Sequence, residues 1–209
     1  MKLYGMPGAC SLAVHIALRE AGLPFEFEEV DYRTRQIAGG GDYYKVNAKG
    51  TVPALLVEEG WLLTEVPVIL QFVAARAPRA KLLPAGDERR RYRALEWLNF
   101  VATEIHKSFS PLFRPSTPEA FLAPGRAHLS KRLMIVESHL DRNRFLMGGD
   151  YCLADAYLFV VCRWLKDQDM ALCDWPSLRR HFDETGERPA VRDALIAEGL
   201  VEPVQAPGF

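Results

Sequence analysis

The chain has 209 residues, of which 49% are hydrophobic and 25% are charged, and its formal net charge at pH 7 is −1. This length suits one ordinary domain with a smaller second one, or two comparable halves, each able to bury a core. A charge so close to zero gives no electrostatic case for nucleic acid or an anionic membrane as partner, and we expect the basic run 89–93 to be a solvated helix face.

Membrane, secretion and metal signals are missing from the sequence. No stretch approaches ~18 uninterrupted apolar residues, the length that spans a bilayer, and the N-terminus lacks the apolar run of a signal peptide. The four cysteines lie far apart, at Cys10, Cys152, Cys162 and Cys173, without the clustering of a zinc site or a disulfide framework. We therefore expect no bound metal, no membrane contact and a cytoplasmic location.

The chain begins with a strand–helix–strand pattern. Residues 2–4 are a strand candidate, and the helix that follows has Ser11 as its expected N-cap and ends at Gly22. Residues 25–28 alternate like a half-buried strand, extended by Val30. A unit of this length predicts two parallel strands with a right-handed crossover.

A hairpin and a proline-led helix come next, after a polar loop. Residues 54–57 and 61–63 are predicted antiparallel strands, with Gly60 in the turn between them. Pro67 suits the first turn of a helix, which ends before Pro78. The N-terminal region thus reads as an α/β unit with a four-stranded mixed sheet.

Beyond a linker at 78–86 the pattern is helical throughout. Apolar residues recur at helical spacing in two stripes, Leu95–Leu98–Ala102–Ile105–Phe109–Leu112 and Leu129–Leu133–Val136–Leu140. The segment 114–125 holds three prolines and is expected to break the pattern, whereas 153–164 is apolar nearly all round and should be a buried central helix. Two shorter amphipathic helices are expected at 177–185 and 190–198.

Cys10 stands where a glycine-containing loop meets the start of a helix. The helix dipole and unpaired N–H groups favour an anion there, so a thiolate at Cys10 would be stabilised. The alternative is an inert, buried cysteine. Ser11 beside it either bonds a ligand thiolate or only caps the helix. No second cysteine stands at the spacing of a dithiol, so a redox role for Cys10 would need a partner thiol from outside.

A polar seam runs along an otherwise apolar helix. Asn99, Thr103, His106 and Ser110 are spaced four, three and four residues apart, with Lys107 beside them. Such a seam faces solvent, a neighbouring backbone or a cleft, and the apolar flanks favour the cleft.

Two carboxylates stand near helix starts. Glu65 either caps its helix or positions an ammonium group. Asp155 occupies a capping-box position and is interpreted as structural, although Cys152 is a poor N-cap and leaves half of the box missing. Pro53 precedes the hairpin, and from the residues alone its peptide bond is expected to be trans.

In combination these segments resemble the cytosolic glutathione S-transferases, and in detail their bacterial beta class. The resemblance is carried by PGACS at 7–11, HIALREAG at 15–22, TVPAL at 51–55, LTE at 63–65, EWLNF at 96–100, TEIHK at 103–107 and ADAY at 154–157. It implies a thioredoxin-like glutathione-binding domain at 1–77, a linker at 78–86 and an all-α domain at 87–209. It also implies a homodimer, with glutathione as the co-substrate.

The resemblance assigns roles in the N-terminal region. Cys10 would contact the glutathione sulfur and form a mixed disulfide with it. Val52, before a cis Pro53, would pair its backbone with the cysteinyl part, and Glu65 would bind the γ-glutamyl end. Val66 stands where the class usually has a small polar residue; its N–H remains, but the missing hydroxyl would weaken binding by ~1.5–3 kcal/mol.

Other site residues follow from the same resemblance. His106 and Lys107 would close the site near the sulfur and the glycyl end. Arg35 would meet the glycyl carboxylate, and Asn99 of the polar seam is counted with the glutathione-binding residues. Tyr4 is an alternative thiolate partner and ranks below Cys10 and Ser11.

The implied activity is conjugation of glutathione to small hydrophobic electrophiles in an apolar pocket that includes Phe109, Phe113 and Trp164, with thiol–disulfide or peroxide-reducing activity through Cys10. Two alternatives stay open at this point. One is a non-catalytic relative that only binds, which Val66 favours, and the other is a dedicated glutathione-dependent isomerase or dehalogenase.

Overall fold

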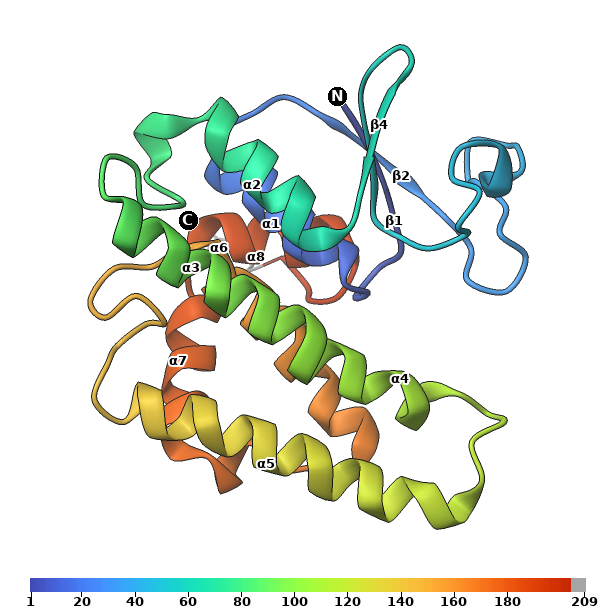
Figure 1. Cartoon of the computed structure of the whole chain (residues 1–209). Helices are drawn as coiled ribbons and strands as arrows, with labels where there is room; N and C mark the ends of the chain where they lie inside the picture. The colour runs from blue at the N-terminus through green and yellow to red at the C-terminus, as the bar shows by residue number, and fades with distance from the viewer. Residues whose placement is uncertain (204–209) are drawn as a thin grey trace, which may run out of the picture.

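A four-stranded sheet with the strand order β2–β1–β3–β4 forms the centre of the N-terminal region (Figure 1). The computed structural model describes residues 1–203 of the chain. The strands are β1 (Lys2–Gly5), β2 (Glu26–Glu29), β3 (Ala54–Glu58) and β4 (Trp61–Thr64). β1 is parallel to β2, and β3 is antiparallel to β1 and to β4, so the predicted mixed sheet is confirmed.

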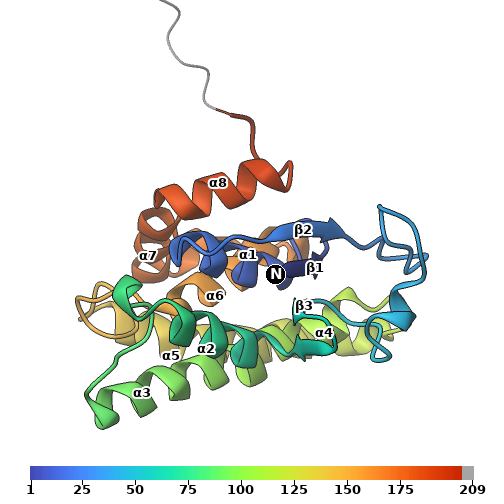
Figure 2. The same ribbon diagram turned by 90° about the horizontal axis from the view of Figure 1, so that it is seen from above.

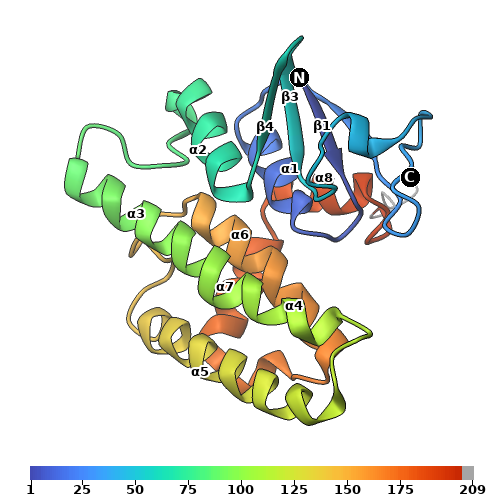
Figure 3. The ribbon, with the colours of Figure 1, turned by 45° about the vertical axis from the view of Figure 1, so that its right-hand side comes forward.

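Alternate side chains of the strands supply two separate cores. Leu3 and Leu55 point to the face covered by α1 (Ser11–Glu20) and α2 (Val66–Arg76), which pack against each other (Figure 3). Tyr4 and Ala54 point to the opposite face, where they pack with Tyr43 of a short 3₁₀ turn. The helix-bearing face is therefore the one that can join a second layer.

Ser11 is not the N-cap of α1, as the sequence had suggested. Cys10 occupies the N-cap position, and Ser11 is the first, fully buried residue of the helix. The Ser11 hydroxyl accepts a hydrogen bond from the Met6 N–H at 3.0 Å and donates one to the Met6 carbonyl at 3.1 Å. It fixes the loop before α1 instead of capping the helix.

The C-terminal region is helical, as predicted. Its helices are α3 (Glu88–Phe100), α4 (Lys107–Phe113), α5 (Leu122–Leu140), α6 (Leu153–Cys162), α7 (Pro176–Gly186) and α8 (Pro189–Ala197). All ten residues of α6 are buried, which confirms it as the central helix. α8 returns to the N-terminal region and packs on α1 (Figure 2). α5 begins inside the expected break at 114–125, because Pro124 falls in its first turn, where the missing N–H costs nothing.

A π-helical segment, Val101–His106, joins α3 to α4 without a break. No pattern in the sequence indicated this segment. Its wider turns, with i→i+5 hydrogen bonds, rotate the residues of α4 relative to those of α3. Side chains that would share one face of a regular helix are therefore separated.

The capping box at the start of α6 is complete, so the prediction that half of it was missing is wrong. Asp155 is fully buried and accepts hydrogen bonds at 2.8 Å from the backbone N–H groups of Cys152 and Leu146 and from His181 Nε2. The structural interpretation of Asp155 agrees with these contacts. It holds α6, α7 and the loop between α5 and α6 together.

Within the described part of the chain, none of the helices is long and apolar enough to cross a membrane. The division of the chain at 78–86 stays a prediction: α2 ends at Arg76 and α3 begins at Glu88, with one 3₁₀ turn between them. The last six residues of the expected second domain, 204–209, lie outside the described residues.

Candidate active site

A cavity of about 720 Å³ lies between the loop before α1 and the helical region. Cys10 and Val52 line it from the N-terminal region, and His106, Phe109 and Trp164 line it from the helical region. Pockets of 300–1,000 Å³ are typical of small-molecule sites. The space is therefore large enough for a peptide-sized ligand and a small second molecule.

The backbone N–H and carbonyl of Gly8 both hydrogen-bond to side chains of the helical region. Its carbonyl accepts a hydrogen bond from Trp164 Nε1 at 2.8 Å, and its N–H donates to Glu198 Oε2 at 2.9 Å. The other oxygen of Glu198 lies 2.8 Å from the buried His15 Nδ1. Gly8 has φ +73°, a conformation that glycine adopts readily. The loop that carries Cys10 is thus fixed by residues far away in the sequence.

Cys10 lies at the cavity and donates a hydrogen bond from Sγ to the Val52 carbonyl at 3.2 Å. Burial raises the pKa of this thiol to about 12, and the charge of Glu65 adds to the rise. The N–H groups of Cys10 and Ser11 and the charge of Lys107 lower this pKa, as the helix start predicts, but burial outweighs them. The predicted effect of the helix start on Cys10 is therefore present, but burial outweighs it and favours the neutral thiol, as in the alternative of a buried cysteine.

The Val52–Pro53 peptide bond is cis. The expectation of a trans bond from the residues alone is wrong, and the one from the family resemblance is confirmed. The Val52 carbonyl, which faces Cys10, lies where the backbone enters β3.

His106 is a neutral hydrogen-bonding group in this site. Burial, and then the charge of Lys107, lowers the pKa of His106 to about 4. Its Nδ1 lies 2.5 Å from the hydroxyl of Tyr157 on α6, whose pKa is raised by burial. Among the described residues that hydroxyl has no other acceptor, so it donates to Nδ1. The imidazole proton is then on Nε2, where it can serve as a donor.

Arg35 brings a cation to the cavity from the loop after β2. It has φ +57°, which is uncommon for a residue other than glycine. The guanidinium carbon lies 4.9 Å from the centroid of the Tyr32 ring, and Nη1 is buried without a hydrogen-bond partner in the described structure. A buried donor without a partner is costly, which suits a position that an anionic ligand completes.

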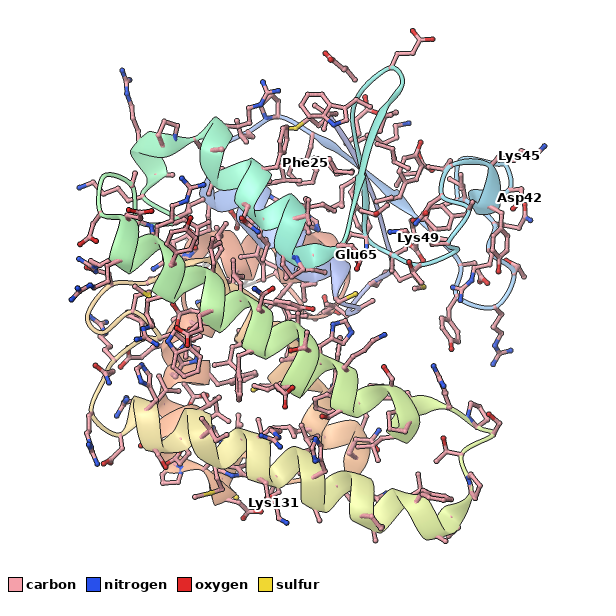
Figure 4. The ribbon with its side chains drawn as sticks, in the orientation of Figure 1. Phe25, Asp42, Lys45, Lys49, Glu65 and Lys131 are labelled. Atoms are coloured by element: carbon pink, nitrogen blue, oxygen red, sulfur yellow. The ribbon has the colours of Figure 1, made fainter. Side chains whose placement is uncertain are left out.

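Glu65 does not cap α2, because its side chain makes no hydrogen bond to the helix start. Its Oε1 lies 2.9 Å from the ammonium of Lys49, and the two side chains approach one another below the hairpin in Figure 4. Glu65 has φ +71° and ψ +119°, a conformation that costs a non-glycine residue roughly 1–3 kcal/mol and is typical of functional sites. The next residue, Val66, is buried.

The polar seam does not lie in the cavity as a whole. His106 and Ser110 line the cavity, whereas Asn99 and Thr103 are exposed and outside its lining, because the π-helical segment separates the two pairs. Lys107 is exposed, yet it is near enough to lower the pKa values of Cys10 and His106. Buried Ser11 is also outside the cavity lining.

Tyr4 is outside the lining as well, and its ring packs 6.0 Å from that of Tyr43. This position agrees with its lower rank as a thiolate partner. Sequence reasoning missed the salt bridge of Lys49 with Glu65 and the bond of Tyr157 with His106. Both depend on contacts between distant segments, and no spacing in the sequence signals them.

All four cysteines, which lie within residues 1–203, are unpaired thiols. The same described residues contain no group of three or more His, Cys, Asp or Glu side chains placed to hold a metal ion.

Fold and cavity together define a thioredoxin-like domain, with a thiol at its first helix, joined to an all-α region. Comparison with known proteins agrees with that class. Residues 8–76 match the family model of the glutathione S-transferase N-terminal domain, and residues 100–189 match that of the glutathione S-transferase C-terminal domain.

Relatives match over nearly the whole chain. Glutathione S-transferase GstA of Escherichia coli O157:H7 is 46% identical, with 96% of this chain and 100% of the relative covered. A sphingomonad glutathione S-transferase complexed with glutathione superposes with a TM-score of 0.92 at 40% identity, and a beta class enzyme of Sphingomonas chungbukensis with 0.92 at 39%, each covering 96% of this chain and 100% of the other.

The chain therefore belongs to the glutathione S-transferase family and is a glutathione transferase. The resemblance to the bacterial beta class is confirmed as well. The alternatives of a non-catalytic binder and of a dedicated isomerase or dehalogenase are not favoured, because the relatives above are named as transferases.

Proposed function

We propose that this cavity binds glutathione beside Cys10 and adds its sulfur to a small electrophile held against the helical region. The observation that supports this most directly is the shared lining: Cys10 and the Val52 backbone meet His106 and Trp164 around one space. The glutathione-bound sphingomonad relative adds support from outside the chain.

Backbone pairing at Val52 would orient the cysteinyl part of glutathione. The Val52 carbonyl already accepts the Cys10 Sγ–H, and a carbonyl oxygen has a second lone pair for a ligand N–H. An extended peptide that adds to a strand end in this way gains main-chain hydrogen bonds without needing specific side chains. Cys10 would then lie beside the cysteinyl sulfur.

Charged groups suit the two ends of glutathione. Arg35, with its unpartnered buried Nη1, would meet the glycyl carboxylate. Glu65 would bind the γ-glutamyl ammonium, which is the same kind of group as the Lys49 ammonium it now binds. The Val66 N–H, at the first position of α2, would meet the γ-glutamyl carboxylate. Lys107 and Asn99 stay predicted contacts.

His106 would stabilise the reactive thiolate. Its Nε2–H is a neutral donor, so it can hydrogen-bond a sulfur anion without first losing a proton to it. Lys107 adds a positive charge nearby. Cys10 itself, with its raised pKa, would act as a thiol donor to the bound sulfur and not as the attacking group.

The test is conjugation of 1-chloro-2,4-dinitrobenzene together with retention on immobilised glutathione. We expect both for the wild-type chain. Replacement of His106 by Asn should lower kcat by about 10²-fold, the usual cost of losing one donor to a developing anion, with a smaller change in KM for glutathione. A wild-type chain that shows neither retention nor conjugation would overturn the proposal.

A thiol–disulfide activity through Cys10 is the second proposal, and the position of its thiol in the cavity supports it. In this reaction the small fraction of Cys10 that is thiolate attacks one sulfur of oxidised glutathione, whose sulfur–sulfur bond breaks. The Cys10–glutathione disulfide forms, and the other glutathione leaves as a thiolate, which takes up the proton that Cys10 lost. Intact mass after incubation with oxidised glutathione should show one adduct that is absent from Cys10→Ala. An adduct that survives this substitution would place the chemistry at another cysteine.

We also propose a cytoplasmic homodimer, in line with the family resemblance. Val68 on α2 is 47% exposed, and further along the same helix the Arg76 guanidinium lies 4.9 Å from the centroid of the Phe72 ring, which packs on Trp61. Exposed apolar groups gathered in this way are typical of an interface. Light scattering should give twice the chain mass of 23.6 kDa, and Val68→Glu should shift the mass toward the monomer. A wild-type monomer at micromolar concentration would contradict the proposal.

A further inference from the structure

The cavity carries more positive charge than the rest of the chain. Its lining includes four cationic side chains, Arg35, Arg114, Arg163 and Lys166, and one acidic one, Asp167. The whole chain has a net charge of −1. Cations gathered in a cleft with low-dielectric walls attract anionic ligands and raise their local concentration.

Within residues 1–203, the three cavity-lining cations of the helical region, Arg114, Arg163 and Lys166, make no ion pair. Among residues 1–203, the salt bridges and side-chain hydrogen bonds do not include Arg114, Arg163 or Lys166. Arg163 is only partly exposed, and burial lowers the pKa of its guanidinium despite the charges of Glu198 and Asp167. A cation removed from water without a partner is unfavourable. The charges of Glu198 and Asp167 and the Phe159 ring, whose centroid is 6.0 Å from the guanidinium carbon, offset this cost in part, and Arg163 is left without an ion pair among the described residues.

The same wall is aromatic. Trp164 lies edge-on to Phe109 and Phe113, with ring centroids 5.4 and 5.8 Å away, and those two rings stack 5.8 Å apart. Phe113 ends α4 at the cavity and is 44% exposed, with the exposed Arg114 directly after it. Aromatic edges and faces of this kind favour a flat aromatic ligand by offset stacking or edge-to-face contact.

Arg35 and the helical-region cations reach the cavity from different parts of the chain. Arg35 belongs to the loop after β2 and suits the glycyl carboxylate of glutathione. Arg163, Lys166 and Arg114 come from the helical region, on or next to the elements that carry the aromatic wall. Arg114 follows the C-terminus of α4, where a cation is also favoured by the helix dipole, so Arg163 and Lys166 are the more informative pair.

We propose that the second substrate is a flat aromatic electrophile that bears a carboxylate or a similar anionic group, with its ring on Phe109, Phe113 and Trp164 and its anion at Arg163 and Lys166. This inference rests on the proposed transferase function and adds the chemical class of the electrophile. In the reaction the glutathione sulfur attacks the ring carbon that bears the leaving group. The carbon–sulfur bond forms and the carbon–chlorine bond breaks, and chloride departs with the bonding electrons. The anionic group binds and takes no part in bond changes.

A pair of matched electrophiles provides the test. 1-Chloro-2,4-dinitrobenzene is neutral, and 4-chloro-3,5-dinitrobenzoate carries a carboxylate, while both lose chloride to the same nucleophile. The readout is the ratio of kcat/KM for the anionic compound to that for the neutral one, divided by the ratio of their uncatalysed rates with glutathione. We expect this corrected ratio to be about tenfold or more above one for the wild type.

Charge removal should lower the ratio through KM for the anionic compound. Arg163→Gln should reduce the corrected ratio about fivefold to tenfold. Lys166→Gln should reduce it about threefold to fivefold, and because Lys166 is exposed this substitution does not put folding at risk. Both magnitudes are those of ion pairs that are partly to fully exposed. Lys131→Gln is the matched control, because Lys131 is exposed on α5, away from the cavity lining (Figure 4), and it should leave both rates unchanged.

The outcomes separate the two proposals. A corrected wild-type ratio near one, or a ratio that neither Arg163→Gln nor Lys166→Gln changes, overturns the anionic class and leaves the transferase function intact. Conjugation of neither compound overturns both. An equal fall in Lys131→Gln would show that the general charge of the chain is responsible, and would also overturn the inference.

Discussion

Alkylation of Cys10 in the protein without glutathione measures how far burial outweighs the start of α1. The thiolate is the reacting form. An exposed thiol of ordinary pKa, about 8.5, is roughly one quarter thiolate at pH 8. With its pKa raised to about 12, Cys10 has on the order of one thiolate in 10⁴ at that pH. The expected rate with iodoacetamide is therefore on the order of a thousandfold below that of a model cysteine peptide.

The pH profile separates this effect from simple steric hindrance. Hindrance lowers the rate by the same factor at every pH, whereas a raised pKa keeps the rate rising about tenfold per pH unit beyond pH 10. Peptide mass spectrometry assigns the label to Cys10. Two variants should move the profile in opposite directions: Glu65→Gln removes a charge that raises the pKa of Cys10, and Lys107→Gln removes one that lowers it. A wild-type profile that levels off below pH 9 would refute the reasoning.

Three further predictions concern stability and binding. Asp155→Ala leaves three buried donors without an acceptor and should lower the free energy of unfolding, measured in urea, by about 3–5 kcal/mol. The exposed Asp150→Ala is the control and should cost less than about 1 kcal/mol; similar losses in the two variants would contradict the role of Asp155. The pKa of His106 is lowered to about 4 in the folded state, so the unfolded chain takes up this proton first as the pH falls. The free energy of unfolding should therefore be unaffected by His106 above pH 6.5 and fall by about 2–3 kcal/mol between pH 6.5 and about 4. Urea titrations of His106→Asn should not show this fall. Val66→Thr supplies a hydroxyl at the start of α2 and should lower the Kd for glutathione about tenfold by calorimetry; an unchanged Kd would show that no hydroxyl is missing there.

Local patterns in the sequence were sufficient for most of the fold. The strands, the hairpin turn at Gly60 and the buried helix α6 follow from periodicity and from turn residues, which act over a few positions. The π-helical segment could not be predicted in this way, because nothing in 101–106 departs from an ordinary helical pattern. This change in helical periodicity explains why the four polar residues, predicted to share one surface, lie on two.

The site was less predictable than the fold, because its properties depend on contacts between distant segments. Cys10 was placed correctly at a helix start, but its protonation depends on burial against Val52, 42 residues further on. Serine is a common N-cap residue, so the sequence suggested this role for Ser11. The structure shows instead that its hydroxyl hydrogen-bonds the backbone of Met6, a contact that the sequence does not indicate. The cis Pro53 came from the family resemblance alone, since no property of the residue itself distinguishes it.

The hydrogen bond between the Gly8 N–H and Glu198 affects when the Cys10 loop can become ordered during synthesis. The two residues are 190 positions apart, and a ribosome adds roughly 5–20 residues per second, so the partner of this loop emerges ~10–40 s after the loop itself. The sheet and α1 can assemble on the nascent chain in that interval. The contact between Glu198 and Gly8 can form only when α8 has left the ribosome, so a chain truncated before Glu198 should lack this contact of the Cys10 loop and bind glutathione more weakly.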